Sequence, residues 1–258
     1  MALVVFTYRS QRLEIDISYV LFVGASTMLT YSLHRLVGIR RMGRFNKAGR
    51  FAIIQHYRSH IVFYAVLSAI VCGVLFWLFD WQMQVYLACA AIISLSYTLP
   101  IFGAGRRLRD FAFIKIFMIA MVWSFVTEAI ILLEESTGSR VMTLLAFVER
   151  FLYFVAITIP FDIRDIVIDK SSKVRTLPTT LGIGNSLLIS YSCLVFAIVI
   201  ALVSRPSEQS LPLTTCYGVS VLLVFLSKDK KADLWYSGFL DGTMSLPLLV
   251  YLLYSTIQ

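Results

Sequence analysis

The sequence predicts an all-α, multi-pass integral membrane bundle of eight transmembrane helices. Of its 258 residues, 59% are hydrophobic and only 15% are charged, whereas an average globular chain carries about 25% charged residues. The mean hydropathy is +0.80, and apolar windows of about 20 residues, the length that crosses a bilayer, recur along the chain. These observations exclude an ordinary soluble domain, and we expect one transmembrane domain over residues 1–258.

Each expected span is an apolar window that a short polar link separates from the next. No link is long enough to divide the chain into domains, and eight spans place both termini on one side. The windows are approximately 17–37, 54–79, 82–102, 111–133, 140–160, 183–203, 210–227 and 239–257.

The basic residues alternate between loops in a way that predicts orientation. Short cytoplasmic loops retain Lys and Arg, and 18 of the 23 basic residues lie in the links after the first, third, fifth and seventh windows or in the window ends that adjoin them. The opposite face keeps only Arg9, Arg12, Arg140 and Arg205. We therefore expect both termini outside, the four basic loops in the cytoplasm, and a bacterial inner (plasma) membrane location. The net charge of +8 then reports orientation, and we expect no nucleic-acid partner.

The N-terminal segment 1–8 is apolar but too short to span a membrane. It lacks the charged-then-apolar layout of a signal peptide. It is either a surface tail or the last part of a ninth helix that precedes the eight windows.

Three carboxylates follow the fifth window within eight residues: Asp162, Asp165 and Asp169. On a continuous helix these offsets lie within about 60° of one another around the axis. Like charges so placed destabilise a helix unless a cation neutralises them. Because Mg²⁺ binds one or two carboxylates together with waters and substrate phosphates, the motif predicts a Mg²⁺ site; the alternative is a solvated loop partly neutralised by Arg164 and Lys170.

The residues that follow the carboxylates favour phosphate binding. Lys173 and Arg175 precede Thr176-Leu177-Pro178, a turn-rich segment suited to a lid over a phosphate. This context favours the metal site over the solvated loop.

The stretch FDIRDIVIDKSSKVRTLPTTLG, residues 161–182, resembles the second aspartate motif of the UbiA-type membrane prenyltransferases. The segment Ser96-Tyr97-Thr98-Leu99-Pro100, with the basic residues after it, is similar to the family's tyrosine-proline-basic segment. Asp241-Gly242 is a weaker match. The family has nine helices, so the eight windows here would be its helices two to nine, with most of helix one missing, in a single UbiA-like domain.

The resemblance implies Mg²⁺-dependent transfer of a prenyl group from a polyprenyl diphosphate to an apolar or aromatic acceptor within the membrane. The aspartates would be the catalytic metal ligands, and Tyr97 would order the site as a hydrogen-bond donor. The expected diphosphate contacts, which include Tyr97, are Arg35, Arg40, Arg106, Arg107, Lys173 and Arg175.

The chain departs from the family at the first aspartate motif, NxxxDxxxD. With Ser32 at the asparagine position, Leu36 and Arg40 stand where the aspartates belong, and no carboxylate occurs between Asp16 and Asp80. Either arginines there contact the diphosphate directly, or the protein is a catalytically inactive relative that binds an isoprenoid lipid or a partner. We favour the enzyme, because a disused second motif would be free to lose its mutually repelling aspartates.

Three ionisable residues fall inside the windows, where charges are costly and usually face the bundle interior. Glu128 and Arg150 are expected to form a cross-helix pair, while Glu149 neighbours Arg150 and points elsewhere. Acceptor recognition and a transport role are the functional alternatives.

The histidines have structural and functional interpretations. His56 and His60 share a helix face without an evident third metal ligand, which favours interfacial positions. His34 lies in the degenerate first motif, where it either contacts a diphosphate or makes a structural hydrogen bond.

Overall fold

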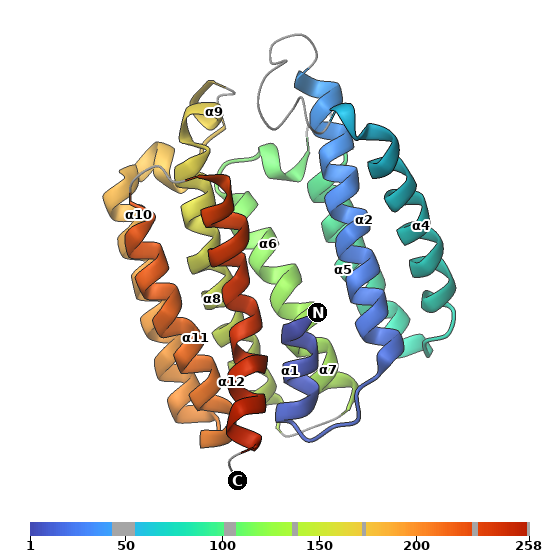
Figure 1. The fold of residues 1–258 in the computed structure, drawn as a ribbon, viewed down its shortest axis with the longest axis vertical. Helices are drawn as coiled ribbons and strands as arrows, with labels where there is room; N and C mark the ends of the chain where they lie inside the picture. The colour runs from blue at the N-terminus through green and yellow to red at the C-terminus, as the bar shows by residue number, and fades with distance from the viewer. Residues whose placement is uncertain (43–54, 101–106, 136–138, 172–173, 229–231, 257–258) are drawn as a thin grey trace. The chain divides into compact units, whose positions relative to one another are not determined.

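A computed structural model describes residues 1–42, 55–100, 107–135, 139–171, 174–228 and 232–256. All regular elements in these ranges are helices (Figure 1), which confirms the all-α class. The chain forms two compact units: unit 1 contains residues 1–15 and 110–258, and unit 2 contains residues 16–109. Arg106, Lys173 and the side chain of Arg40 lie outside the described part of the chain.

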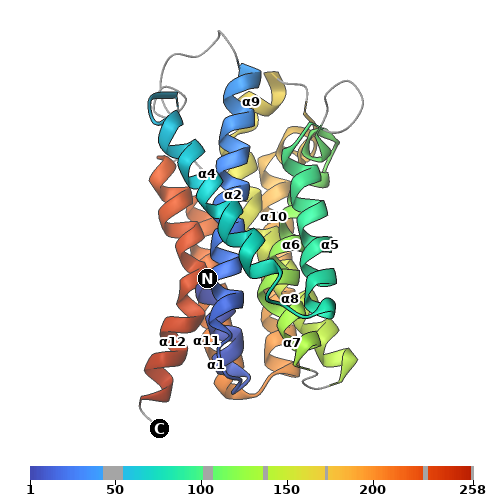
Figure 2. The same cartoon turned by 90° about the vertical axis from the view of Figure 1, so that its right-hand side faces the viewer.

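Unit 2 consists of three long helices, α2 (Ile17–Met42), α4 (Arg58–Phe76) and α5 (Trp81–Thr98), and α2 packs against the other two (Figure 2). Aspartate side chains cap the N-termini of α2 and α5. The amide of Tyr19 donates to Oδ1 of Asp16 and the amide of Met83 donates to Oδ1 of Asp80, both at 3.1 Å. Such bonds satisfy amides that have no partner in the first helical turn.

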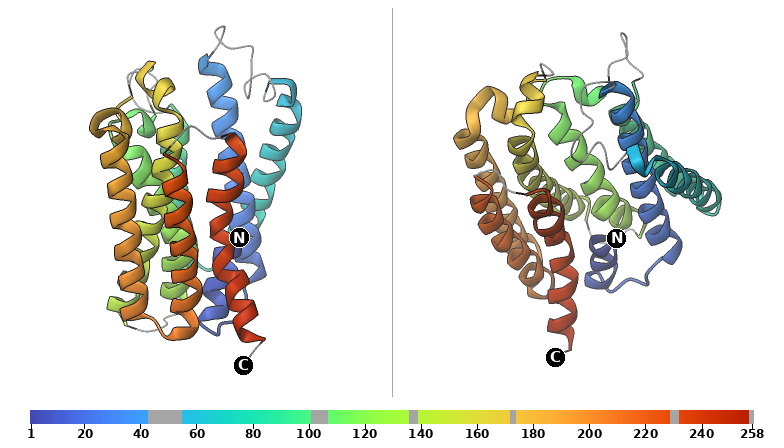
Figure 3. Two further views of the ribbon diagram at one scale, coloured as in Figure 1. Left: turned by 60° about the vertical axis from the view of Figure 1, so that its left-hand side comes forward. Right: turned by 45° about the horizontal axis from the view of Figure 1, so that its top comes forward.

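Unit 1 is organised around α8, which packs against α6 and α10, while α11 packs between α10 and α12 (Figure 3). The C-terminal half of α8 is buried on nearly every side, with Tyr153, Phe154 and Ile157 in the core. The helical elements of unit 1 are α1 (Ala2–Ser10), α6 (Ile114–Ser124), the π-helical η3 (Phe125–Ala129), α7 (Ile130–Glu134), α8 (Arg140–Arg164), α9 (Ile166–Ser171), α10 (Leu177–Ser204), α11 (Ser207–Leu226), the π-helical η4 (Trp235–Leu240), the 3₁₀ turn η5 (Thr243–Ser245) and α12 (Leu246–Ser255).

Six helical segments in the described ranges are long and apolar enough to cross a membrane. They coincide with six of the eight predicted windows. The window 82–102 corresponds to α5, and the window 239–257 contains the end of η4 together with η5 and α12. Neither is among those six segments. The multi-pass membrane fold is therefore confirmed, with six spans found by length and composition.

The N-terminal segment is a helix, and its interpretation as a surface tail is wrong. Leu3, Val4 and Phe6 of α1 are almost fully buried, and α1 packs against α12 and η3 within unit 1. A helix as short as α1 is stabilised by such packing rather than by its helix propensity.

The helix that carries the aspartates is interrupted inside the motif. α8 ends at Arg164, Asp165 follows as the C-cap with φ −90° and ψ 6°, and α9 begins at Ile166. The prediction of three carboxylates on one continuous helical face is wrong in this respect, because Asp165 leaves helical geometry.

Gly182 adopts φ +82° and ψ 165° near the start of α10, and the helix is kinked there. This region of backbone space is open essentially to glycine alone, and a Cβ at Gly182 would meet nothing within 4 Å. We expect Gly182→Ala to lower the free energy of unfolding by about 1–3 kcal/mol through backbone strain, measured by thermal melting in detergent. The matched control is Gly184→Ala, which is also free of neighbours but has no positive φ, so it should be neutral or stabilising. Equal melting of the two variants would contradict this prediction.

Candidate functional site

The aspartate motif lies at the end of α8, where packing fixes the backbone. Asp162 is fully buried, Asp169 is 8% exposed, and the side chain of Asp165 is 19% exposed. Because carboxylates are rarely buried without compensating partners, the contacts of each one determine what it can bind.

Lys115 of α6 forms an ion pair with Asp162, and the lysine side chain is itself 11% exposed. The sequence placed Lys115 among the basic residues of a cytoplasmic loop, and that assignment is wrong. Hydropathy alone does not predict the ion pair of Lys115 with Asp162, because the pair depends on how α6 packs against α8. The first carboxylate of the motif thus has a cation supplied by the protein.

Arg164 binds Asp165 with two parallel hydrogen bonds, Nε to Oδ1 at 3.0 Å and Nη2 to Oδ2 at 3.1 Å. Nη1 of the same guanidinium is 3.6 Å from Oδ1 of Asp233. The guanidinium carbon lies 5.3 Å from the ring centre of Phe161 and 5.1 Å from that of Tyr236. The second carboxylate therefore also faces a cation of the chain.

The segment after the motif begins α10 with a capping box. The amide of Thr176 donates to Oγ1 of Thr179 at 2.8 Å, and Pro178 stands in the first turn, where the lack of an N–H is tolerated. The amide of Phe113 donates to the carbonyl oxygen of Arg175 at 3.1 Å, which ties this segment to the start of α6. Arg175 itself is exposed and available to an anion.

The donor chemistry of the motif suits a hard divalent cation, since carboxylate oxygens are the ligands that Mg²⁺ prefers. Among the described residues no group of three metal-binding side chains is close enough to form a complete site by itself. Mg²⁺ commonly needs only one or two carboxylates, with waters and phosphates as the other ligands. The motif fits that smaller requirement.

In unit 2 the degenerate first motif holds a cluster of basic and aromatic side chains. Nη1 of Arg109 lies 3.2 Å from Nδ1 and 2.8 Å from Nε2 of His34, and because a guanidinium can only donate, a ring nitrogen of His34 is the acceptor. The ring of Tyr97 lies beneath this pair, 5.4 Å from the Arg109 guanidinium carbon. Sequence reasoning considered His34 and Arg109 separately, and only their contact shows that they form one group.

Besides Tyr97, the side chains of two expected phosphate ligands of unit 2 are described. Arg35 is partly buried, and its Nη2 donates to the hydroxyl of Tyr31 at 3.0 Å. Arg107 is also partly buried. The other histidines of this unit, His56 and His60, are exposed and contact the ring of Tyr57 that lies between them in sequence.

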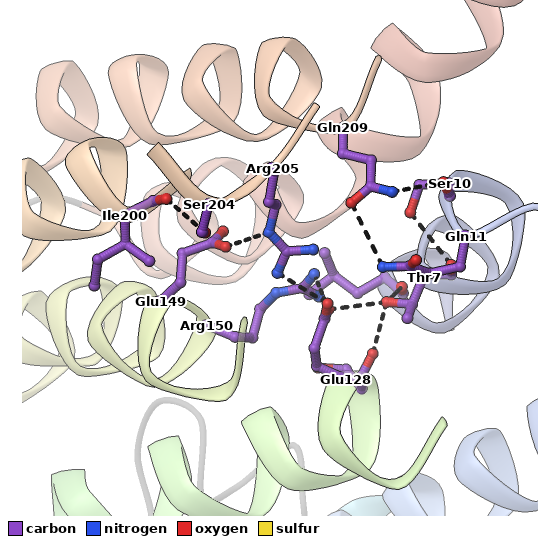
Figure 4. A network of polar contacts seen from close by, with 12 residues as sticks. Thr7, Ser10, Gln11, Glu128, Glu149, Arg150, Ile200, Ser204, Arg205 and Gln209 are labelled. Carbon is purple, nitrogen blue, oxygen red and sulfur yellow. Dashed lines mark hydrogen bonds and ion pairs between the residues drawn. The ribbon is translucent and has the colours of Figure 1, made fainter. Parts of the chain in front are cut away.

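A second polar cluster lies in unit 1 (Figure 4), about 18 Å along α8 from Asp162. Arg150 forms an ion pair with Glu128, which confirms the predicted cross-helix pair. Nη2 of Arg205 donates to Oε1 of Glu128 at 2.9 Å, and its Nε forms an ion pair with Glu149. The two carboxylates and two guanidiniums form a buried network that we call the charge network.

Neutral groups complete the charge network. The hydroxyl of Tyr217 donates to Oε1 of Glu149 at 2.6 Å, and Oγ1 of Thr7 lies 3.1 Å from Oε2 of Glu128. Burial lowers the pKa of Arg205, which lies in the turn between α10 and α11, but attraction by Glu128 and Glu149 outweighs burial and raises that pKa overall. The sequence assigned Arg205 to the outer surface, yet its side chain is only 5% exposed, so it belongs to the interior.

Comparisons with known proteins show the family and the fold. The model of the UbiA prenyltransferase family matches residues 55–235. The apo structure of a UbiA homolog from Aeropyrum pernix K1 is similar to this fold with a TM-score of 0.64 and 13% sequence identity, over 99% of this chain and 94% of that chain. No curated protein matches the sequence.

Proposed function

The chain belongs to the UbiA prenyltransferase family, and on that premise we propose that it transfers a prenyl group from a polyprenyl diphosphate to an apolar or aromatic acceptor within the membrane. The observation that supports the proposal is the aspartate motif, with Asp162 at the buried end of α8, Asp165 at its C-cap and Asp169 in α9, followed in sequence by the exposed Arg175. We propose a plasma membrane location with the motif on the cytoplasmic side.

The proposed metal is Mg²⁺, held by Asp165 and Asp169, with Asp162 also in the predicted ligand set. When bound, the metal neutralises charge on the diphosphate as it leaves. Asp162 is held by Lys115, so the buried carboxylate at the end of α8 already has a cation of the chain as its partner. Lys173 and Arg175 are proposed to contact the diphosphate as positioned cations.

The charge distribution of unit 2 supports phosphate contacts there. Of the residues 16–109, only Asp16 and Asp80 are acidic, against ten basic residues. Asp16 precedes the first residue of α2, about 25 Å along the helix from His34. The positive charge near Arg35 thus has no carboxylate close to it in sequence, whereas Arg109 is followed directly by Asp110. We propose that Arg35, Arg40, Arg106, Arg107 and Tyr97 contact a diphosphate anion.

The proposed reaction breaks the bond between the allylic carbon and the diphosphate oxygen, and the diphosphate leaves with the electron pair. The allylic cation is attacked by the acceptor, which then loses a proton. The chain's role is to hold the diphosphate and stabilise the charge that develops on it.

A non-catalytic relative that binds an isoprenoid lipid is the second candidate. It is favoured by the missing first motif and by the two ion pairs, Lys115 with Asp162 and Arg164 with Asp165, that neutralise carboxylates internally. A transporter has less support, because the buried charges on which that role would depend pair with one another in the charge network.

The test is release of inorganic pyrophosphate by the full-length protein in detergent or nanodiscs, with Mg²⁺ and prenyl diphosphates of increasing chain length, together with a mixture of lipophilic aromatic acceptors. We expect release that depends on Mg²⁺ and stops on chelation. If no prenyl diphosphate is consumed under any of these conditions, the enzyme proposal fails and the lipid-binding candidate takes its place.

A further inference from the structure

Arg164 is placed so that it can exchange partners. It is the last residue of α8, and it binds both oxygens of the adjacent Asp165. Neighbouring side chains on a regular helix point about 100° apart and cannot pair in this way. The pair forms at the end of the helix, where Asp165 is the C-cap with φ at −90° and ψ at 6°.

The bidentate pair uses the atoms that a metal would need. A hard cation would bind Asp165 through one or both carboxylate oxygens, and in this structure each of them accepts a hydrogen bond from Arg164. The side chains are 18% and 19% exposed, so solvent screens the interaction less than it screens a surface ion pair. A cation that chelates both oxygens must therefore displace the guanidinium, and a cation bound to a remaining lone pair of one oxygen is repelled by its positive charge.

A second carboxylate is available to receive the guanidinium. Asp233 lies just before η4, its Oδ1 is 3.6 Å from Nη1 of Arg164, and its side chain is 65% exposed. The rings of Phe161 and Tyr236 contact the guanidinium at 5.3 and 5.1 Å, and arginine stacks favourably on aromatic faces. Arg164 can thus shift from Asp165 towards the exposed Asp233 while it keeps its contacts with these rings.

We propose that Arg164 is a positioning residue that competes with the divalent cation for Asp165. When the cation is absent it binds Asp165 and also lies 3.6 Å from Asp233; when the cation is bound it pairs with Asp233 alone. This inference rests on the proposed function only in taking Asp165 as a metal ligand.

Binding of Mn²⁺ alone, without substrate, tests the inference. Free Mn²⁺ is measured by its electron paramagnetic resonance signal with the full-length chain in detergent. We expect Arg164→Gln to bind Mn²⁺ roughly tenfold more tightly, because a charge-assisted pair need no longer be broken. Asp233→Asn should bind Mn²⁺ several-fold more weakly, since it removes the alternative partner.

The double variant and a matched control separate competition from a general charge effect. Arg164→Gln with Asp233→Asn should match Arg164→Gln alone, because Asp233 acts only through Arg164. Lys170→Gln is the control. Lys170 is exposed and follows Asp169 directly, and its substitution removes one positive charge, as Arg164→Gln does. Its effect should be small, because solvent screens exposed charges.

Three results would overturn the inference: unchanged or weaker binding in Arg164→Gln, an equal gain in Lys170→Gln, or no weakening in Asp233→Asn. If Arg164→Gln fails to fold, Asp233→Asn still carries the test. Wild-type protein that binds no Mn²⁺ would overturn both this inference and the proposed metal site. Mn²⁺ binding with the expected pattern but no prenyl transfer would remove the enzyme proposal and leave the inference standing.

Discussion

Replacing Asp165 and Asp169 together by Asn is expected to reduce Mg²⁺-dependent pyrophosphate release by at least about a thousandfold. Metal stabilisation of a leaving phosphate contributes several kcal/mol to the transition state, and each 1.36 kcal/mol changes the rate about tenfold. The substitution keeps the size of both side chains and removes two negative charges. The ion pair of Lys115 with Asp162 remains, so the end of α8 should keep its fold.

The control for this variant is the double substitution Asp16→Asn with Asp80→Asn. It removes the same two charges at the helix starts of unit 2, where asparagine caps a helix as well as aspartate does, so activity should stay close to wild type. Retained pyrophosphate release in the Asp165 and Asp169 variant would contradict the assignment of these ligands. Lost release with retained prenyl diphosphate binding would place the aspartates in catalysis rather than in lipid recognition.

Replacing Arg205 by Met is expected to lower the free energy of unfolding by about 3–5 kcal/mol, the range for removing one partner of a buried ion pair. The variant leaves Glu128 paired with Arg150 but removes the cation from Glu149. Tyr217 still donates a hydrogen bond to Glu149, yet one neutral donor does not replace a positive charge. Reversible unfolding by detergent titration measures the change.

Two further variants make the test of Arg205 specific. Arg12→Gln removes an arginine from the exposed pair with Glu208 and should change stability little, because exposed pairs contribute little. Glu149→Gln combined with Arg205→Met should be less destabilising than the sum of the two single changes, since both act on one network. Wild-type stability in Arg205→Met would show that Glu149 tolerates burial without the arginine.

The sequence predicts those parts of the fold that depend on local composition. Hydropathy gives the windows, and six of them correspond to helices of spanning length. The aspartate motif is recognisable by spacing, and the pair of Glu128 with Arg150 follows from the cost of isolated charges in a membrane. Each of these inferences needs only neighbouring residues or a general physical rule.

The remaining features depend on packing between distant elements. Arg205 and Lys115 look like loop cations in sequence, and only the positions of α8 and its neighbours show that both are buried against carboxylates. The short helix α1 falls below any length criterion and is stabilised by α12. The pair of Arg164 with Asp165 lies at the point where α8 ends, and a helical wheel does not show where a helix ends.

The π-helical turn η3, which carries Glu128, has a consequence for comparing this chain with its relatives. A π-turn closes i→i+5 hydrogen bonds and so contains about one residue more than the α-helical turn it replaces. A relative with a regular α-helix here should therefore align with a gap of about one residue inside a transmembrane segment, where alignment methods disfavour gaps. If the gap is placed in a loop instead, Glu128 will be matched to the wrong position, and the carboxylate of the charge network will look like an unrelated substitution.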